Sequence, residues 1–575
     1  MHLVRRISPK VSSVPLLAID CENDPLSGRF LHAHLYSEDP PTDLHFTDID
    51  LLESWLMSQH KKGTHHKTPP FVLIGFNFRY DSPFITRIVD DLKTLWAEGR
   101  FISGRLKNGI KMLDLMNHID SGQSLANWIE YLDMEKRFGV KKLSLRELEK
   151  RNRFDAMATW YMGDSIQRFY VEELKIPLKL TIGSCALTLF LSRFFDHCWK
   201  RSDDQQWLND YERVALRGGR TECFQRGRIR HVSYDVNSTY LSIMRDHDFP
   251  DPISACYVGS NKDFESNFAK YDSIVDCVVE APKSKIMVLP YYDPTLKKLT
   301  FPCGTFAGRW SSPELKIALE NGYKILAVKS YIYYTRSFPY FRSFAEFVWS
   351  KRAEYQGKGN IGMDKLIKKI GNTCYGKFGQ ANDTGGYWGK LDDYDVDIDQ
   401  SVVRVQKIGG IEYISVPSGN KVDSLHTFPV IPVFVAAYAR VKLFLAMKKN
   451  EEGVVYCDTD SIKSRLPVKG ISLGKDLGEW AFEGIFEHVF YKSKWYGDKL
   501  KGVPKRAKQV SDSRDFAEFL YDKPVGFKEA IRKGELWNVW KALPKRVSKI
   551  DDKRIWSGRL SDPLQMCYND LEVRK

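Results

Sequence analysis

The sequence has little of what marks a secreted, zinc-stabilised or membrane protein. Its ten cysteines are scattered, with no CxxC pair and no Cys/His cluster, so neither a structural zinc site nor a disulfide framework is indicated. The longest apolar stretch, Leu180 to Ser192, has 13 residues, and a bilayer-spanning helix needs roughly 20. Residues 1–10 contain no apolar segment of the length that a signal peptide requires. We therefore expect an intracellular protein without a membrane anchor, located wherever its substrate is found.

Repeats of fixed period and low-complexity tracts are also missing. Of the 575 residues, 43% are hydrophobic and 13% aromatic, which suffices for several packed cores and excludes a disordered chain. This length is typical of roughly three or four domains. The net charge is +14, and residues 491–575 alone carry 21 Lys or Arg against 12 Asp or Glu. Such a balance suits a polyanionic partner.

The first third of the chain has an α/β pattern. Apolar runs at Pro15–Ile19 and Phe71–Phe76 predict buried strands, and residues 47–61 have the apolar spacing of a helix. A second helix is predicted through Phe84, Ile85, Ile88, Val89, Leu92 and Trp96. Because acidic residues follow the first strand, we expect them at the carboxyl edge of a sheet, where the sites of α/β proteins usually lie.

From about residue 200 the pattern changes to α+β. Residues 260–340 and 380–425 read as insertions, the first rich in strand formers and prolines. The second contains Gly385-Gly386, Gly409-Gly410 and Ser418-Gly419, which indicate hairpin turns. We expect the stretch after residue 500 to be basic and mostly helical.

A first set of acids lies in the α/β region. Asp20 and Glu22 are two apart on a strand and so project to the same side. Further acids at Asp81 and Asp164 would allow two divalent cations about 4 Å apart, an arrangement suited to phosphodiester hydrolysis. An acidic pair at a strand end is common, so this set alone is weak evidence.

A second set is spread over three distant segments. Asp235 follows a strand-like stretch, and Asp458 and Asp460 lie in a hairpin-like one. Between them, Lys368, Asn372 and Tyr375 are spaced to line one helix face, with Lys365 one turn earlier. Such a face can hold a triphosphate and stack on a base, although a solvated basic face with a buried tyrosine explains the same spacing.

Together these segments resemble the family B DNA polymerases, in the family's order and over most of the chain. Asp20/Glu22, Asn77/Tyr80/Asp81 and Asp164 fall where the family has its three exonuclease motifs. The polymerase motifs are similar to Asp235–Tyr240 (D-x-x-S-x-Y), Lys368–Gly376 (K-x3-N-S-x-Y-G), Tyr456–Ser461 (Y-x-D-T-D-S) and Lys494–Tyr496 (K-x-Y).

Within the family, the chain more closely resembles the protein-primed replicases of phages, adenoviruses and linear plasmids. Arg217-Gly218-Gly219 is similar to their Y-x-G-G element, and Ser124-Leu125, with Trp128, to their strand-binding motif. Lys142 is the candidate for their K-x2-h lysine. The long intervals before Lys368 and after Phe378 match the places of the subgroup's two insertions.

The sequence departs from the family pattern at several positions. Leu216 replaces the tyrosine of Y-x-G-G, and Thr373 replaces a serine. The third exonuclease motif has Trp160 at its usual tyrosine, with Tyr161 next to it. Since Trp offers only an N–H donor, water positioning is in question, but the retained carboxylates favour active proofreading.

The resemblance implies a fold and a domain order. We expect a multidomain α/β and α+β protein in which an RNase H-like 3′–5′ exonuclease domain precedes a right-hand polymerase. The expected parts are 1–175 exonuclease, 176–259 linker and first part of the palm, 260–342 terminal-protein-contacting insertion, 343–379 fingers, 380–425 strand-displacement insertion, 426–503 second part of the palm, and 504–575 basic thumb.

The resemblance also implies residue roles. Two Mg²⁺ ions per active site, replaceable by Mn²⁺, would bind Asp235, Val236, Asp458 and Asp460, and likewise Asp20, Glu22, Asp81 and Asp164. The implied nucleotide-binding residues are Val236, Tyr240, Lys351, Arg352, Lys368, Asn372 and Tyr375. The implied DNA-binding residues are Asn77, Tyr80, Ser124, Leu125, Lys142, Arg217, Gly218, Gly219, Lys494 and Tyr496.

The implied function is protein-primed replication of a linear viral or plasmid genome with proofreading. Its partners would be template and primer DNA, dNTPs and a terminal protein, with the polymerase as a monomer or as a heterodimer with that protein. Three alternatives remain: a family B enzyme using ordinary primers or none, a catalytically silent DNA-binding relative, and a nuclease whose polymerase part only grips DNA. The intact second set of carboxylates argues against the last two.

Overall fold

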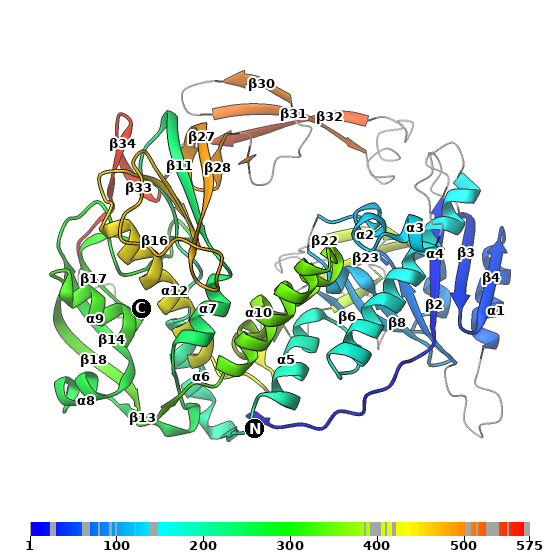
Figure 1. The fold of residues 1–575 in the computed structure, drawn as a ribbon, viewed down its shortest axis with the longest axis horizontal. Helices are drawn as coiled ribbons and strands as arrows, with labels where there is room; N and C mark the ends of the chain where they lie inside the picture. Colours follow the sequence, from blue (N-terminus) through cyan, green and yellow to red (C-terminus); the bar gives the residue numbers. More distant parts are fainter. Residues whose placement is uncertain are drawn as a thin grey trace.

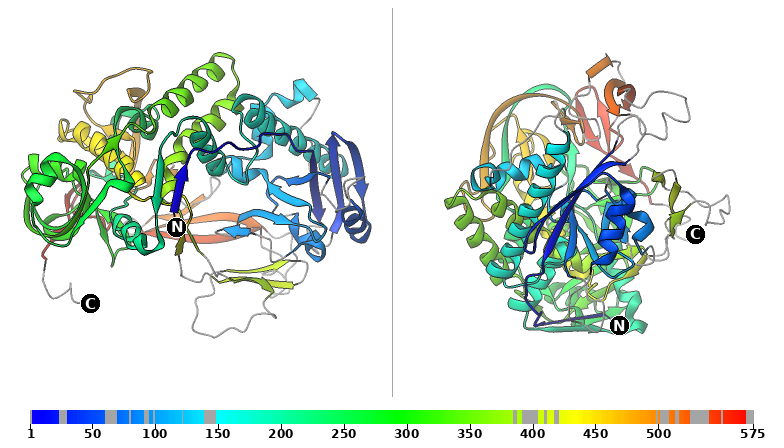
Figure 2. Two further views of the ribbon diagram at one scale, coloured as in Figure 1. Left: turned by 90° about the horizontal axis from the view of Figure 1, so that it is seen from below. Right: turned by 90° about the vertical axis from the view of Figure 1, so that its right-hand side faces the viewer.

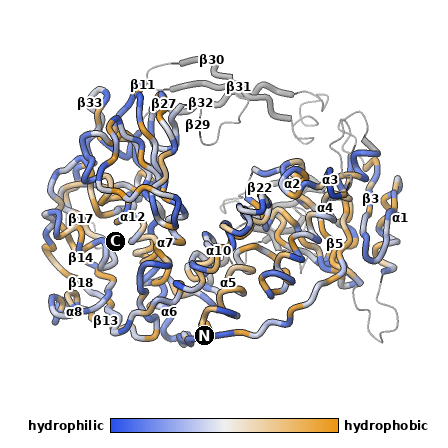
Figure 3. Tube along the Cα trace, in the orientation of Figure 1, coloured by the Kyte–Doolittle hydropathy of each residue, from blue (hydrophilic) through white to orange (hydrophobic). Residues whose placement is uncertain are grey.

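The computed structural model places the chain in two lobes joined by helices (Figure 1). It describes residues 2–568 except 24–29, 60–69, 79–80, 91–94, 98–99, 121, 139–147, 384–386, 391–403, 409–410, 417–420, 498, 501–507, 513–515, 525–539 and 549–550. Hydrophobic stretches run through both lobes (Figure 3); one buried cluster lies within the N-terminal lobe, one within the second, and a third contains residues of both, such as Leu16 and Phe434.

The N-terminal lobe is built on a seven-stranded sheet with the order β4-β3-β2-β5-β8-β7-β6. Strands β2, β5 and β8 run parallel at its centre, as the α/β pattern predicts. Helices α1 and α4 pack on opposite faces (Figure 2). The bounds are β2 Leu16–Asn23, β3 Phe30–Glu38, β4 Pro41–Phe46, β5 Val72–Gly75, β6 Leu95–Ala97, β7 Arg100–Arg105, β8 Lys111–Asp114, α1 Ile49–Ser58, α2 Leu125–Tyr131, α3 Met134–Phe138 and α4 Leu148–Arg168.

The predicted helix from Phe84 to Trp96 is wrong. The chain instead forms a 3-10 segment, η1 (Ser82–Ile88), kinked at Ile85, and then strand β6. Val89 bridges to Leu106 in antiparallel fashion. Ile85, Ile88 and Val89 are buried in the sheet's core without a continuous helix, because the neighbouring strand supplies backbone partners for this segment.

The first strand does not join this sheet. β1 (His2–Arg5) pairs with β9 (Cys198–Arg201), and the Leu3 amide donates to the Leu425 carbonyl at 2.8 Å. The chain therefore starts beside the second lobe and crosses to the first (Figure 1).

The second lobe contains another seven-stranded sheet, with the order β10-β25-β26-β11-β27-β28-β29. The apolar side chains of Tyr234 and Val236 pack on α12 residues such as Leu443 and Phe444. By strand alternation, Ser233 and Asp235 project to the opposite face. The bounds are β10 Thr221–Cys223, β11 Gly227–Val236, β25 Val454–Asp458, β26 Ser461–Ser464, β27 Trp480–Lys492, β28 Trp495–Tyr496, β29 Lys499–Leu500, α6 Gln206–Val214, α7 Thr239–Asp246 and α12 Val430–Lys448.

Helix α12 has the length and apolar composition of a membrane span. However, 78% of its most apolar window is buried inside the protein, which is typical of a core helix.

Three helices connect the lobes. Helix α10 (Arg342–Gly357) turns back into α11 (Ile361–Cys374), and α5 (Ile182–Arg193) packs on α11. The apolar stretch at 180–192 is therefore mostly a helix that fills the core between the lobes. Residues 255–334, joined by the short strand β35 from the C-terminal part of the chain, form a separate sheet with the order β13-β18-β14-β17-β35. The bounds are β13 Ala255–Val258, β14 Asp272–Ala281, β17 Cys303–Ser311, β18 Lys324–Tyr334, β35 Gln565–Met566, α8 Phe264–Lys270 and α9 Ser312–Glu320.

The residues of all three predicted hairpin turns, Gly385-Gly386, Gly409-Gly410 and Ser418-Gly419, lie outside the described residues. Beside the second of them, Ile408 pairs with Ile411. The strands of this region are β20 Ala381–Asp383, β21 Tyr387–Lys390, β22 Arg404–Ile408, β23 Ile411–Val416 and β24 Lys421–Asp423.

The prediction that the chain after residue 500 is mostly helical is wrong for the described part. β30 (Lys508–Asp512), β31 (Phe516–Pro524) and β32 (Trp540–Ser548) form an antiparallel sheet above both lobes (Figure 1). The chain then returns to the second lobe as a hairpin of β33 (Arg554–Ser557) and β34 (Leu560–Pro563).

Candidate active sites

Three carboxylates converge on the α4 side of the N-terminal sheet. Asp20 and Glu22 project from β2, and Asp155 comes from α4. One ligand atom from each lies within 4.8 Å of the others. Among the described residues this is the one group of three or more such side chains that is this compact, so it can hold a hard divalent cation.

The electrostatics of this cluster also fit a cation. Burial raises the pKa of Asp20, and the nearby charges of Asp81, Asp155 and Glu22 raise it further. Burial likewise raises the pKa of Glu22 and of Asp155, in each case offset by the Arg151 guanidinium. A divalent cation would relieve this repulsion.

The motif pattern did not indicate Asp155, which the structure brings into this group; Asp164 is not a member of it, and its predicted part in metal binding stays a prediction. Asp164 lies nine residues further along α4, about 13.5 Å at the rise of an α-helix. Its carboxylate pairs with Arg168 at 2.9 Å. The carboxylate in the cluster is therefore Asp155, and Arg151, four residues before it, contacts it at 3.2 Å.

The aromatic residues expected in the third motif have structural roles. The Trp160 indole is buried and donates to the Leu16 carbonyl at 3.0 Å. Tyr161 donates to Glu38 at 2.8 Å and stacks on Phe138. Neither side chain is therefore available to position water at the cluster.

Asp81 supports the cluster from the strand side. Its Oδ1 accepts the Cys21 amide at 2.9 Å, between the two strand carboxylates, and burial raises its pKa. The compact group does not include Asp81, so its predicted part in metal binding stays a prediction.

The residues predicted to hold single-stranded DNA near this cluster are placed in part. Asn77 has a backbone φ of 69°, and its backbone N–H donates to the Asp114 carboxylate at 2.9 Å. Ser124 caps α2, because its hydroxyl oxygen accepts a hydrogen bond from the backbone N–H of Asn127 at 3.3 Å, and Leu125 is the first residue of the helix. Tyr80 and Lys142 lie outside the described residues.

A second acidic site lies on the open face of the second sheet. Asp235 on β11 pairs in register with Ser461 on β26, and Asp458 and Asp460 flank the turn from β25 to β26. The Val236 amide donates to the Asp460 carbonyl at 2.9 Å, and Thr459 holds the turn with φ 60°. The strand-and-hairpin placement predicted for these segments is confirmed.

These carboxylates strongly influence one another. Burial, then Asp460, then Glu483 raise the pKa of Asp235 to about 7. Burial and Asp458 raise the pKa of Asp460. Lys368 of α11 lowers both pKa values, so the predicted lysine does face this site. A divalent cation fits here because it would replace the proton that Asp235 otherwise holds.

Asp458 is turned toward other partners. Its Oδ1 accepts the Thr221 hydroxyl at 2.9 Å and also contacts the Lys494 ammonium. Lys494 has φ 62°, and its amide donates to the Tyr456 hydroxyl at 3.1 Å. Tyr496 packs against Tyr456, with ring centroids 4.9 Å apart. The K-x-Y element thus lies beside the carboxylates.

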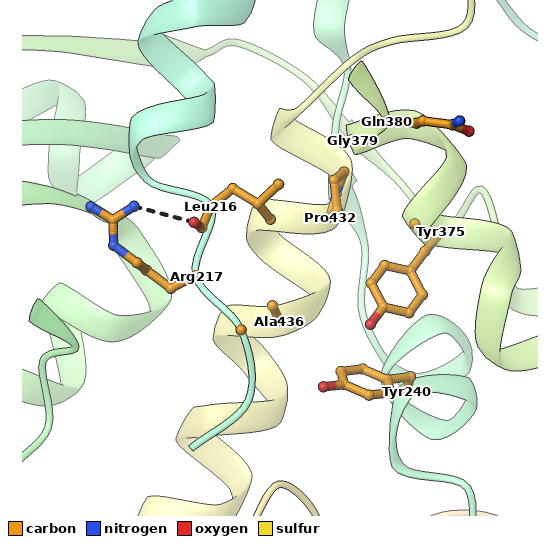
Figure 4. A pocket seen from close by; sticks show the side chains of 10 residues that line it. Leu216, Arg217, Tyr240, Tyr375, Gly379, Gln380, Pro432 and Ala436 are labelled. Carbon is orange, nitrogen blue, oxygen red and sulfur yellow. Dashed lines mark hydrogen bonds between the residues drawn. The ribbon is translucent and has the colours of Figure 1, made fainter. Parts of the chain in front are cut away.

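The predicted helix face is present on α11. Lys368 and Asn372 are exposed, and Tyr375 is half-buried against Tyr240, with ring centroids 5.0 Å apart. These two rings line a pocket of about 420 Å³ (Figure 4). Its remaining walls are Leu216, Arg217, Gly218, Gly376, Gly379, Gln380, Pro432 and Ala436.

The Gly-Gly element lies directly against the turn that contains Thr459. A Cβ at Gly219 would come within 2.8 Å of the Thr459 side chain, so a side chain there would displace the turn. The carbonyls of Arg217 and Gly218 accept hydrogen bonds from the buried Arg440, at 2.6 and 2.9 Å. The Arg217 side chain points away from Tyr240 (Figure 4).

The two residues of α10 that were predicted to bind nucleotide, Lys351 and Arg352, both form ion pairs. Lys351 pairs with Glu354 at 2.7 Å. Arg352 pairs with Asp364 at 2.9 Å and donates to the Ser238 hydroxyl at 2.8 Å, which places it beside the Asp235 segment.

Sequence reasoning missed a buried ion-pair network behind Asp458. Glu222 lies between Arg220 at 2.5 Å and Arg554 at 2.8 Å, and all three are at most 3% exposed. The sequence offered only one hint of this network, the spacing of Arg220, just before β10, and Glu222 on it, because Arg554 is distant in sequence.

Comparisons with known proteins show what the chain is similar to. Residues 159–414 match the family described as DNA polymerase type B, organellar and viral. A probable DNA polymerase of Podospora anserina is 23% identical over 397 residues, which are 62% of this chain and 31% of that protein. The DNA-directed DNA polymerase of Enterobacteria phage PRD1 is 26% identical over 356 residues, 60% of each chain.

The fold matches solved structures of Phi29 DNA polymerase. One crystal form gives a TM-score of 0.63 at 16% identity and covers 89% of both chains. The complex of that enzyme with primer-template DNA and incoming nucleotide gives 0.62 at 15% identity, covering 93% of this chain and 92% of the other. This chain spans between a quarter and three fifths of the length of the fungal relatives it matches.

Proposed function

Starting from its place among the type B DNA polymerases of organelles and viruses, we propose that this chain copies a DNA template by adding dNTPs to a primer. The observation that carries the proposal is the meeting of Asp235, Asp460 and Lys368 from three distant segments on one sheet face. Two-metal phosphoryl transfer needs such a set of acids, with a cation nearby for the phosphates.

At this site the protein holds and orients the reactants. Asp235 and Asp460, with Asp458 and the Val236 carbonyl beside them, would hold two Mg²⁺ ions. When bound, these ions lower the pKa of the primer hydroxyl and balance charge on the leaving pyrophosphate. Lys368 neutralises the triphosphate, with Arg352 or Lys351 as a second cation, because phosphoryl transfer relies on positioning and positive charge.

The pocket beside this site selects the nucleotide. Tyr240 lies beneath the sugar and leaves no space for a 2′-hydroxyl, while Tyr375 and Asn372 face the new base pair. Lys494 and Tyr496 hold the primer end, and the Arg217–Gly219 element guides the template.

We propose a 3′–5′ exonuclease at the first site. Asp20, Glu22 and Asp155 would hold the metal ions that activate water, with Asp81 fixing the strand between the first two. Asn77, Ser124 and Leu125, together with Tyr80 and Lys142, would grip the frayed 3′ end. Arg151 provides a positive charge next to Asp155.

The domain roles and protein priming are also proposals. Residues 260–342 would contact a terminal protein, 380–425 would favour strand displacement, and the strands after residue 504 would act as a thumb. The similarity to phage polymerases supports priming from a terminal protein's hydroxyl. An enzyme using ordinary primers has the same sites, so the discriminating test is transfer of one labelled nucleotide to a partner protein.

Primer extension tests the main proposal. A 5′-labelled primer on a single-stranded template, with Mg²⁺ and dNTPs, should be extended by the wild type but not by Asp460→Asn. Without dNTPs it should be shortened, except by Asp20→Ala/Glu22→Ala. A wild type that binds DNA tightly but neither extends this primer nor labels a terminal protein would favour the silent relative. Shortening without either synthesis would favour the nuclease.

A further inference from the structure

Asn152 lies behind the carboxylate cluster of the first site. It is on α4, one turn before Asp155, and is fully buried. Its Nδ2 donates to the Asp20 carbonyl at 2.8 Å and to Asp20 Oδ2 at 2.7 Å. A single side-chain amide therefore fixes both the backbone and the carboxylate of Asp20. No described residue donates a hydrogen bond to Asp20 Oδ1, the other carboxylate oxygen.

His32 fixes the orientation of this amide. Its Nδ1 lies 3.2 Å from Asn152 Oδ1, and because an amide oxygen can only accept, His32 is the donor. The opposite amide orientation would place Oδ1 against the Asp20 carbonyl oxygen, which cannot donate, and against the Asp20 carboxylate, which cannot donate when ionised. His32 lies on β3, where it is paired in register with Glu22 of β2. Its ring packs edge-on against His45, with ring centroids 5.3 Å apart.

We propose that Asn152, oriented by His32, is a positioning residue that holds Asp20 with Oδ1 directed to a bound divalent cation. The inference rests on the proposed nuclease function of this cluster and adds two residues that orient one of its metal ligands. Groups that orient metal ligands commonly change metal affinity by about 10- to 100-fold when removed. Leucine at position 152 has nearly the same size but no donor, so Asp20 could rotate away from Glu22 and Asp155.

The chain offers a matched control on the same helix. Gln167 is also a buried amide of α4, and it exchanges hydrogen bonds of 3.0 Å with the backbone of Val14. These hydrogen bonds do not involve the carboxylate cluster. Gln167→Leu therefore tests whether loss of a buried amide from α4 is enough to weaken metal binding.

Direct Mn²⁺ binding, followed by electron paramagnetic resonance, tests the inference. The full chain carries Asp235→Asn/Asp460→Asn, so that the second site does not contribute. Asn152→Leu should weaken the remaining site about tenfold or more, whereas Gln167→Leu should leave it unchanged. His32→Gln, which keeps a donor, should bind Mn²⁺ better than His32→Leu. Mn²⁺ affinity of Asn152→Leu within twofold of its parent would overturn the inference.

The same series separates this inference from the function on which it rests. Adding Asp20→Ala to the parent should abolish the remaining Mn²⁺ signal. If the parent binds Mn²⁺ as expected but the enzyme with an intact second site does not shorten a primer, the nuclease proposal fails and the positioning role stands. If the parent binds no Mn²⁺ that depends on Asp20, the positioning role fails.

Discussion

The protonation of Asp235 should couple DNA synthesis to pH through metal binding. Burial and the charge of Asp460 raise the pKa of this carboxyl to about 7. A group with a raised pKa keeps its proton until the pH passes that value, so the metal-free site is mostly protonated at pH 6 and mostly ionised at pH 8. Mg²⁺ must displace the proton, and its apparent affinity should fall as the pH falls.

The size of the effect follows from the ionised fraction. For a pKa of about 7, that fraction is about 0.09 at pH 6 and about 0.91 at pH 8. The Mg²⁺ concentration for half-maximal extension should therefore be about tenfold higher at pH 6 than at pH 8. Saturating Mg²⁺ should remove this part of the pH dependence, since the bound cation excludes the proton.

Single-turnover primer extension over a Mg²⁺ series at both pH values measures this ratio. Reading the half-saturating concentration, rather than the maximal rate, separates metal binding from deprotonation of the primer hydroxyl. Glu483→Gln removes one of the charges that raise the pKa of Asp235 and should reduce the ratio. Equal half-saturating concentrations at pH 6 and pH 8 in the wild type would refute the reasoning.

Three further predictions concern single side chains. Asp155→Asn should abolish primer shortening, whereas Asp164→Asn should retain most of it; the reverse result would restore the motif-based assignment. Arg554→Met leaves the buried Glu222 carboxylate with one partner fewer, so it should lower the free energy of unfolding of the second lobe, measured in urea, by about 3–5 kcal/mol. A loss below about 1 kcal/mol would contradict the stabilising role of this ion-pair network. Tyr240→Ala should admit ribonucleotides in a competition assay, and unchanged discrimination would contradict its place beneath the sugar.

The second site was predictable because its residues lie in short, characteristic segments. Local pattern indicated that Asp235, Asp458 and Asp460 lie at strands and that Lys368 and Tyr375 share a helix face. Strand alternation likewise put Asp20 and Glu22 on one side. These patterns alone were weak evidence for a site, and the roles followed from the resemblance to the family B polymerases.

Asp155 could not be found by the same means. No tyrosine stands four residues before it, whereas Trp160 and Tyr161 come shortly before another acid, Asp164, which the motif pattern favours. What selects Asp155 is its position on α4 over β2, which is a tertiary fact. Asn152 is still less visible, because a buried asparagine has no sequence signature of its own.

The C-terminal strands were missed for a different reason. Phe516, Phe519 and Leu520 have helical spacing, but pairing between β31 and β32 overrides that local preference. Pro544 was the available warning, since it fits an edge strand such as β32 far better than a helix interior.

The ion pair between Glu222 and Arg554 joins residues 332 positions apart, and this sets the order in which a newly made chain can fold. Every strand of the N-terminal sheet lies between residues 16 and 114, and Asp155 follows soon after. Domains fold largely in the order in which they leave the ribosome. A nascent chain therefore gathers the acids of the first site early, whereas β10, beside Asp458, lacks its last partner until residue 554 has been added. During synthesis, the proposed nuclease lobe matures before the proposed polymerase site is complete.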